Sequence, residues 1–330
     1  MIRPFCLSAA VACRGYSLPL QRAIVDFGAD VAFGRIPEKL KEHYGIEVPV
    51  SSARAITYQH AGEIYRAEVV ATEVPERTGV AQLIVEMDGS MVPIVEREQR
   101  QKGSATMDRR KDKRLKWEEA RLSMAHGAGA ATPHFRATLG TVDEAGEQLL
   151  TCAVEAGAGR ETKIHAVGDG ATWIAEQVEQ KFGAQATYLI DFYHLCEYLS
   201  AAAESVENKA AWLMEQKSRL KENRLSEVVE ELTPYMESPE VASADAPVRA
   251  FTRYVRNRPG QFNYKESIAA GLPIGSGEIE SAHRYVVQQR LKIPGAWWLI
   301  GNARNVLALR VLRANNKWHN YWQHSNQKAA

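Results

Sequence analysis

Short apolar runs alternate with amphipathic helical stretches through the middle of this chain of 330 residues. We expect strands around residues 137–142, 164–167 and 187–190, because each run is short, apolar and bounded by turn residues. Residues 143–156 and 173–182 lie between these runs and repeat their apolar positions with helical spacing. Alternation of this kind predicts an α/β fold, in which helices pack against a sheet.

A strand-turn-strand pattern precedes this region, over residues 82–95. Leu83 and Val85 begin an alternation that runs to Asp88-Gly89, and a second apolar run follows. Asp-Gly is a favoured pair in tight hairpin turns, so the pattern predicts a turn at this point. Asp88 is then expected at the tip of an apolar strand.

The first 65 residues have helical periodicity. Ile36 and Leu40 share one helix face, Gly45 interrupts the pattern, and Ser51 is the expected N-cap of a further helix. Two short helices joined by a glycine-containing turn indicate a helix-turn-helix, whose second helix can enter the DNA major groove. A small helical bundle without DNA contacts fits the pattern equally well.

Residues 197–258 are rich in Ala, Glu, Lys and Leu and have no strand pattern. Pro234, Pro239 and Pro247 are expected to separate the helices of this stretch. We therefore divide the chain into four parts: a helix-turn-helix-like region (1–65), an α/β core (80–196), an all-helical insertion (197–260) and a segment that returns to the core (261–330).

Charged residues cancel over the whole chain but not locally. The 41 Lys and Arg residues against 40 Asp and Glu leave a formal net charge of +1, which alone indicates no nucleic-acid partner. Residues 109–116 nevertheless hold six basic residues and one acid, and residues 281–317 hold seven basic residues and no acid. Residues 222–245 hold seven acids and one base. The two basic segments are therefore candidate phosphate-binding surfaces.

The four cysteines, Cys6, Cys13, Cys152 and Cys196, are scattered and form no Cys-x-x-Cys pair. Their spacing argues against a zinc ribbon and a disulfide framework, and it fits a reducing cytoplasm. The sequence has no long uninterrupted apolar run, so we expect neither a membrane span nor a membrane partner.

Three acidic residues are candidates for chemistry. Asp88 and Asp169 stand where apolar strands are expected to end, which is where α/β proteins place their sites. Glu280 stands in Gly-Ser-Gly-Glu-Ile-Glu-Ser, where a helix is expected to begin after a flexible turn. Each has a structural alternative: a hairpin turn for Asp88, an N-cap for Asp169, and a helix-dipole partner for Glu280. Glu278 competes with Glu280, but on a helix the two point in different directions.

Three carboxylates together can hold two hard divalent cations through oxygen ligands. Such a pair, roughly 4 Å apart, stabilises both the attacking and the leaving oxygen at phosphorus. No Cys and His set for zinc and no Ser-His-Asp motif competes in the sequence. We therefore expect two Mg²⁺ or Mn²⁺ ions at Asp88, Asp169 and Glu280.

Three motifs give a more specific indication: VGDGATWI (167–174), LIDFYHL (189–195) and PIGSGEIESA (273–282). They resemble motifs of the ISKra-type insertion-sequence transposases, and the resemblance extends to residues 39–50 and 115–121. It covers nearly the whole chain. The resemblance implies a ribonuclease-H-like catalytic core of the DDE class with a helical insertion before the last acid. It also implies cleavage and strand transfer at the terminal inverted repeats of an insertion sequence.

By this resemblance Asp88, Asp169 and Glu280 are the catalytic, metal-binding acids. Asp191 and His194 match the Asp-x-x-His element that follows the second acid, and their spacing places both on one helix face. Asp191 as a helix cap, with His194 in the first turn, is an equally good interpretation. The family also implies double-stranded DNA as partner, a homodimer that holds two element ends, and a place at the nucleoid in the bacterial cytoplasm.

Basic side chains are the candidate DNA contacts. They are Arg109, Arg110, Lys111, Lys113, Arg114, Arg284, Arg290 and Lys292, followed along the chain by Arg304, Arg310 and Arg313. Neutralising phosphates would make the affinity for DNA depend on salt. Trp297-Trp298 could stack on an unpaired base, although core packing is the preferred interpretation.

Two other functions stay open. Family members often carry more sequence before the N-terminal helices, so a truncated or domesticated, catalytically inactive DNA-binding relative is the main alternative. A glycosidase also uses two carboxylates, but the basic segment over residues 281–317 disfavours it.

Overall fold

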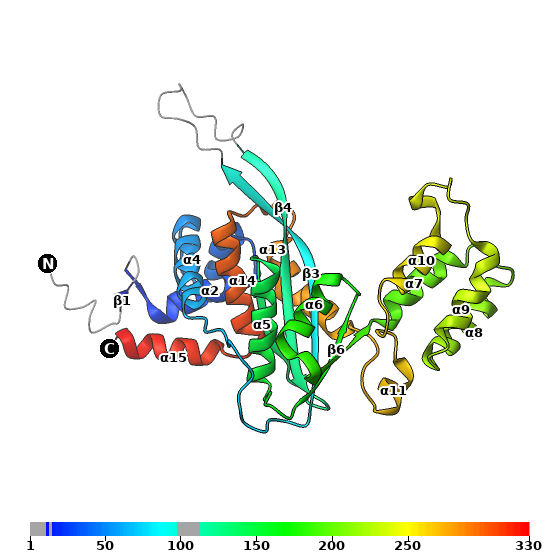
Figure 1. Ribbon diagram of the computed structural model, residues 1–330. Helices are drawn as coiled ribbons and strands as arrows, with labels where there is room; N and C mark the ends of the chain where they lie inside the picture. Colours follow the sequence, from blue (N-terminus) through cyan, green and yellow to red (C-terminus); the bar gives the residue numbers. More distant parts are fainter. Residues whose placement is uncertain (1–10, 13–14, 98–112, 330) are drawn as a thin grey trace, which may run out of the picture.

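The computed structural model describes residues 11–12, 15–97 and 113–329 of the chain. Figure 1 shows a central sheet with helices packed against it. N-terminal and C-terminal helices lie together at one end of the molecule, and a helical lobe stands at the other end (Figure 1). Within these described ranges, no helix is both long enough and apolar enough to cross a membrane.

Five strands form the central sheet: β3 (Gln82–Arg97), β4 (Lys113–Gly127), β5 (His134–Thr138), β6 (Lys163–Gly168) and β7 (Ala186–Ile190). They lie in the order β5-β4-β3-β6-β7. β3, β6 and β7 run parallel, while β4 is antiparallel to both of its neighbours. The predicted α/β fold with a mixed sheet is therefore confirmed. A separate short pair joins β1 (Val11–Ala12) and β2 (Tyr16–Ser17).

The predicted turn at Asp88-Gly89 is wrong. β3 runs unbroken through both residues, which pair with Leu122 and Arg121 of β4. The chain stays extended because Val92 and Ile94, beyond the pair, are fully buried in the core. Asp88 therefore lies inside a long strand rather than at its tip.

β4 has no counterpart among the predicted strands. Its outer half is polar and exposed, which hides the alternation that marks a strand. It forms because it pairs with β3 along its whole length, and because Leu122 and Met124 of its inner half are fully buried. β5 also begins earlier than expected, at His134, since the chain has already entered the next helix at Val142.

The two faces of the sheet bury different cores. α5 (Val142–Glu155) and α6 (Thr172–Phe182) pack on one face, against Leu83, Val85 and Met87 of β3. The other face carries α12 (Gly277–Ala282), a π-helical turn η5 (His283–Gln288), α13 (Gln289–Leu291) and α14 (Ile300–Ala314). Because side chains alternate along a strand, Glu86 and Asp88 face this second layer.

The N-terminal helices are α2 (Leu18–Asp30), α3 (Ile36–Tyr44) and α4 (Val50–Arg66), with a short 3₁₀ turn η1 (Phe33–Arg35) between the first two. They share a core with α14 and with α15 (Trp318–Ala329). α3 ends at Gly45, whose φ of 66° is left-handed. The N-cap of α4 is Pro49 rather than Ser51, so that predicted cap is wrong. The helix-turn-helix assignment stays a prediction.

The helical lobe is built from α7 (Phe192–Ala202), α8 (Lys209–Lys221), α9 (Leu225–Leu232) and α10 (Pro247–Arg256). Two 3₁₀ turns, η3 (Thr233–Tyr235) and η4 (Ser243–Asp245), lie between α9 and α10, and α11 (Tyr264–Ala269) follows. The helical stretch predicted over residues 197–258 is confirmed, and Pro234 and Pro247 stand at helix starts. The lobe has its own core around Leu220, Val228 and Phe251.

One short 3₁₀ turn, η2 (Gly183–Gln185), connects α6 to β7. The helical lobe follows the sheet directly, because α7 begins two residues after β7 ends. α10 then packs against α7. This arrangement brings the lobe next to the ends of β6 and β7.

Candidate active site

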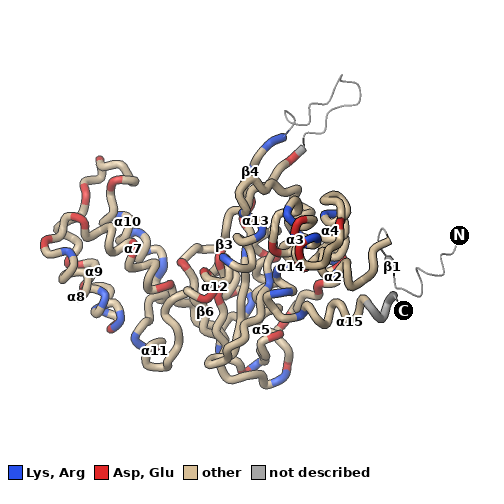
Figure 2. The backbone as a smooth tube through the Cα atoms, turned by 180° about the vertical axis from the view of Figure 1, so that it is seen from behind, with Lys and Arg blue, Asp and Glu red and all other residues tan. Residues whose placement is uncertain are grey.

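Three aspartates stand side by side across the parallel strands. Val167 of β6 pairs with Glu86 of β3 on one side and with Leu189 of β7 on the other. Neighbouring strands lie about 4.8 Å apart, so residues two positions further along each chain fall at one level. These residues are Asp88, Asp169 and Asp191, which we call the aspartate row. Figure 2 shows acidic positions gathered where β6 meets α12.

Asp88 is the half-buried member of the row that comes from β3. Its Oδ1 accepts a hydrogen bond from the backbone N–H of Gly89 at 2.7 Å. Its Oδ2 lies 3.4 Å from Nε2 of His283, whose side chain is only 2% exposed. Burial raises the pKa of Asp88 and the charge of Asp169 raises it further, whereas His283 and the Gly89 N–H lower it. The carboxylates of Asp88 and Asp169 are therefore close enough to repel each other electrostatically.

Asp169 lies on the loop between β6 and α6, and the helical lobe holds this loop in place. The Tyr254 hydroxyl donates to the carbonyl of Asp169 at 2.7 Å, and Arg258 Nε donates to the carbonyl of Gly170 at 2.7 Å. Gly170 has a φ of 84°, and a Cβ there would lie 2.3 Å from the Tyr254 hydroxyl. Asp169 Oδ1 accepts from the N–H of Ala171 at 2.8 Å, so Asp169 caps a turn while Ala171 is the N-cap of α6.

Asp191 is 2% exposed and uses both carboxylate oxygens inside the protein. Oδ1 accepts from the N–H groups of Tyr193 and His194, at 2.6 and 2.9 Å, which makes it the N-cap of α7. Oδ2 accepts from the N–H and the hydroxyl of Ser276, at 2.5 and 2.7 Å. Asp191 therefore ties the start of α7 to the turn that precedes Glu280.

His194 lies beside the row without entering it. Its ring makes edge contacts with Tyr198 and Tyr254, with centroids 5.4 and 6.0 Å away. Its Nδ1 is 3.7 Å from Oε2 of Glu197, and its charge lowers the pKa of Asp88. The hydrogen bonds from Tyr193 and His194 make Asp191 the N-cap of α7, as the helix-cap interpretation expects, and the His194 ring lies at the edge of the row.

Glu280 is exposed on α12, and its side chain has no hydrogen bond or ion pair with any residue that the structure describes. Burial raises its pKa, and the charges of Asp191 and Asp88 raise it further. A hollow of about 370 Å³ beside it is lined by Asp191, Tyr193 and the glycine-rich turn. Glu280 therefore shares this hollow with Asp191 and lies within electrostatic range of Asp88.

Glu278 lies elsewhere, although it is only two residues from Glu280. Its Oε2 is 3.3 Å from Nε2 of the buried His126, at the inner end of β4. This is the divergence expected of two helical positions separated by two residues. The geometry favours Glu280 over Glu278 as a partner of Asp88.

Two residues of the site are absent from the sequence-based candidates. Glu86 is 1% exposed, and its Oε2 accepts from the N–H of Ile279 at 2.9 Å, which fastens α12 to β3. Burial raises the pKa of Glu86 to about 8, and nearby acids add to this. The spacing of His283 could have identified it, because residues three positions apart lie on the same helix face and His283 follows Glu280 by three. Glu86 shares the strand face of Asp88 by period-two alternation.

The donor set suits a hard divalent cation, because it consists of carboxylate oxygens with like charges close together. In the described part of the chain, however, no group of three or more His, Cys, Asp or Glu side chains is close enough to hold one metal ion. Asp88 therefore interacts electrostatically with Asp169 and with Glu280. The three side chains do not lie close enough together to coordinate one metal ion.

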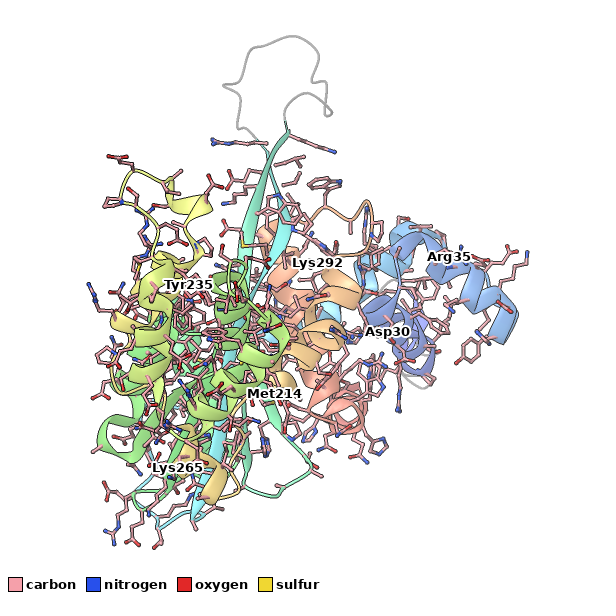
Figure 3. The ribbon with its side chains drawn as sticks, turned by 90° about the vertical axis from the view of Figure 1, so that its right-hand side faces the viewer. Asp30, Arg35, Met214, Tyr235, Lys265 and Lys292 are labelled. Atoms are coloured by element: carbon pink, nitrogen blue, oxygen red, sulfur yellow. The ribbon has the colours of Figure 1, made fainter. Side chains whose placement is uncertain are left out.

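Four of the candidate DNA contacts are exposed in the structure. Lys113 and Arg114 lie at the outer end of β4, and Arg284 lies on η5. Lys292 Nζ is 3.2 Å from the hydroxyl of Ser90, two residues beyond Asp88; Figure 3 shows Lys292 beside the long hairpin. Arg109, Arg110 and Lys111 lie outside the described residues.

Arg290 has a different place from the one the sequence suggests. It is 2% exposed, and its guanidinium lies 4.6 Å from the ring of Phe33 and 4.8 Å from that of Trp298. Its Nε donates to the carbonyl of Gly28 at 2.9 Å. Arg290 therefore holds the N-terminal helices on the core, and the burial of its charge leaves no route to a phosphate.

Arg310 and Arg313 also serve internal contacts. Arg310 is 8% exposed and pairs with Asp30, and Arg313 pairs with Asp26 at 2.7 Å. Asp30 is labelled in Figure 3, where α2 meets the C-terminal helices. Arg304 is partly buried and donates to the carbonyl of Leu139. Three of the seven basic residues over 281–317, namely Arg290, Arg310 and Arg313, therefore bind the core to α2.

Comparisons with known proteins give two findings. The chain is similar to one in the solved Drosophila P element transposase strand transfer complex, with a TM-score of 0.30 and 10% sequence identity. That similarity covers 97% of this chain and 84% of the other, and at this score it carries no argument about function. A search of curated proteins found no match.

A family model also matches the chain, over residues 154–318. The matched half contains Asp169, Asp191, Glu280 and His283, whereas Asp88 precedes it. A match of this extent assigns the family: the chain belongs to an uncharacterised protein family, UPF0236.

Proposed function

We propose that this protein is a DDE-class transposase of the ISKra type, which cuts and joins DNA at the terminal inverted repeats of an insertion sequence. The observation that carries the proposal is the aspartate row together with Glu280. Asp88 lies on β3, and Asp169 directly follows the adjacent parallel strand β6. Glu280 lies on α12, which hydrogen bonds to Glu86 and Asp191 hold beside these strands.

The strand order supports a ribonuclease-H-like core. β3 is central, with a hairpin on one side and two parallel crossover strands on the other. In a ribonuclease-H-like sheet the first strand occupies this central place and carries the first acid, as β3 carries Asp88. Sites of α/β folds lie at the carboxyl ends of parallel strands, which is where Asp169 lies. The helical lobe then corresponds to the insertion before the last acid.

We assign two Mg²⁺ or Mn²⁺ ions to Asp88, Asp169 and Glu280. Bound ions of this kind would neutralise charge that develops on the phosphate oxygens and lower the pKa of a bound water. Burial raises the pKa of Asp88, and the charge of Asp169 raises it further. Burial also raises the pKa of Glu280, together with the charges of Asp191 and Asp88, so cations would relieve a repulsion that is already present. Asp191 keeps the structural role described above and holds the turn before Glu280.

The proposed reaction has two steps, hydrolysis at the element end and transfer of the cut strand to target DNA. In the first, a water oxygen bonds to phosphorus, and the bond from phosphorus to the DNA 3′ oxygen breaks, leaving a 3′-hydroxyl and a 5′-phosphate. In the second, the oxygen of that 3′-hydroxyl bonds to a phosphorus of the target strand, and the bond from this phosphorus to its 3′ oxygen breaks. The proton of the attacking hydroxyl is balanced by the new 3′-hydroxyl on the target strand. Exposed Lys113, Arg114, Arg284 and Lys292 would contact phosphates, as would the three basic residues at 109–111. A homodimer would hold both element ends.

The test is cleavage of end-sequence DNA by purified full-length chain with Mg²⁺ or Mn²⁺. We expect Asp88→Asn, Asp169→Asn and Glu280→Gln each to lower cleavage by three orders of magnitude or so, as happens when acyl or phosphoryl transfer loses a central electrostatic group. Glu278→Gln is the matched control, because it removes a neighbouring charge that faces His126. It should retain cleavage.

Retained cleavage in any of the three acid variants would remove that residue from the site. DNA binding by the wild-type chain without metal-dependent nicking would instead support a catalytically inactive DNA-binding relative of transposases. The flanking DNA of the gene gives independent information: inverted repeats with short direct duplications outside them would establish mobility.

A further inference from the structure

A pocket far from the aspartate row has the composition of a nucleotide-binding site. It has a volume of about 780 Å³ and lies between α4, the outer half of the β3–β4 hairpin and the segment before α14. Pockets of roughly 300–1,000 Å³ suit small ligands and single nucleotides. Val95 lines it, seven residues along β3 from Asp88. At about 3.3 Å per residue this is roughly 23 Å from the row.

The indole of Trp297 lines the pocket, and the backbone next to it is fixed to β3. Trp298 pairs with β3, since Val95 N–H donates to the carbonyl of Trp298 at 2.7 Å and Trp298 N–H donates to that of Pro93 at 3.3 Å. Trp298 turns inward and is 3% exposed, whereas Trp297 is 50% exposed. The core packing predicted for the pair therefore holds for Trp298 alone, and Trp297 presents an exposed aromatic ring in the pocket lining.

Positive charge from two other elements lines the same pocket. Arg54 comes from α4 and Lys113 from β4, and the lining contains no acidic residue. Neither cation forms an ion pair with any residue that the structure describes. Tyr58 also lines the pocket and supplies a second aromatic ring. Aromatic faces combined with unpaired cations are the elements of single-strand recognition, where bases stack and phosphates are neutralised.

We propose that this pocket binds single-stranded DNA, with a base stacked on Trp297 and its phosphates held by Arg54 and Lys113. The proposal rests on the proposed function, for which it names a strand-binding surface separate from the place of cleavage. A second copy of the chain is the rival occupant, since Leu115 and Leu299 are also exposed in the lining. Charge decides between them: two cations without acids match a polyanion, and buried unpaired charges would weaken a protein interface.

The experiment measures binding of full-length chain to a labelled single-stranded oligonucleotide of about twelve nucleotides by fluorescence anisotropy. The same strand in a duplex is the reference. EDTA is present throughout, so that cleavage plays no part. The variants are Trp297→Ala, Trp297→Phe, Arg54→Ala and Lys113→Ala. Trp117→Ala is the matched control, because Trp117 is 56% exposed on β4 but does not line the pocket.

We expect Trp297→Ala to weaken single-strand binding by about 5- to 100-fold and duplex binding much less, with Trp297→Phe restoring most of the loss. Arg54→Ala and Lys113→Ala should weaken binding and reduce its salt dependence. Unchanged affinity in Trp297→Ala, or an equal loss in Trp117→Ala, overturns the proposal. So does a change in oligomeric state on sizing columns without a change in affinity, which identifies a protein interface. Because no metal is present, these results are independent of whether the chain cuts DNA.

Discussion

His283 Nε2 lies 3.4 Å from Asp88 Oδ2, although the two residues are 195 positions apart in the sequence. His283 follows Glu280 by three positions in a continuous helical run, so one side of that run carries both residues toward β3. Burial lowers the pKa of His283, although the charge of Asp88 opposes this. The contact between His283 and Asp88 therefore links β3 to the helical run that begins with α12.

We expect His283→Ala to lower metal-dependent cleavage by about tenfold, the effect of roughly 1.4 kcal/mol, because the Asp88 carboxylate loses the ring that orients Oδ2. His283→Asn should recover part of the activity, since an amide N–H can face Oδ2 in place of the ring. The measurement is the cleavage rate as a function of Mg²⁺ concentration. His126→Ala is the control, because it removes a buried histidine near α12 that faces Glu278. An equal loss in both variants would assign His283 a merely structural role.

Substitution of Asp191 should mainly reduce stability, whereas substitution of Asp169 should mainly reduce cleavage. Asp191 accepts four hydrogen bonds inside the protein, so Asp191→Ala should reduce the free energy of unfolding by roughly 2–4 kcal/mol. Asp169→Asn should abolish cleavage with little loss of stability, since removing its charge relieves repulsion with Asp88. Chemical denaturation and cleavage assays on both variants decide this. Comparable destabilisation of the two would contradict the division of roles.

Tyr254 should control the Asp169 loop from the helical lobe. Tyr254→Phe keeps the ring, which stacks on Tyr198 with centroids 4.4 Å apart, but removes the hydrogen bond to the Asp169 carbonyl. We expect about a fivefold higher Mg²⁺ requirement for cleavage, because a lost hydrogen bond of about 1 kcal/mol loosens the loop. Tyr198→Phe serves as control. Identical Mg²⁺ profiles for wild type and Tyr254→Phe would show that the lobe does not position this acid.

The N-terminal helices should loosen from the C-terminal ones as the pH falls. His60 is 4% exposed, with Nδ1 2.7 Å from the Tyr321 hydroxyl and Nε2 2.9 Å from Gln21 Oε1. Burial lowers its pKa in the folded state, partly opposed by Glu63. The unfolded chain therefore binds more protons near pH 6, so stability is lost as the pH falls through about 6.5.

One such histidine contributes a slope of at most about 1.4 kcal/mol per pH unit. The measurement is urea denaturation between pH 7.5 and 5 for wild type and His60→Gln. The variant should lose less stability over this range, whatever its stability at pH 7.5. Burial also lowers the pKa values of His134 and His165, so some slope should persist. Parallel curves for the two proteins would exclude His60 as a source of the pH dependence.

Local patterns were sufficient where an element depends on its own residues. β6, β7, α5 and α6 lie close to their predicted positions, because apolar alternation and helical spacing are written within each segment. β4 was not predictable in this way, since its polar outer half is extended only through pairing with β3. The turn expected at Asp88-Gly89 failed for the same reason: burial of Val92 and Ile94 outweighs the preference of one dipeptide.

For the candidate site, the sequence by itself determined which carboxylates were available and that Asp169 and Asp191 follow short apolar strands. Only the tertiary structure decided that these two share a row with Asp88, and that Glu86 and His283 lie beside it. It also placed Glu278 against His126 and Glu280 in a hollow with Asp191. It also placed Arg290 inside the core. The physical reason is that electrostatic interaction and desolvation depend on distance and burial in space, and neither quantity exists until strands and helices far apart in the chain have packed together.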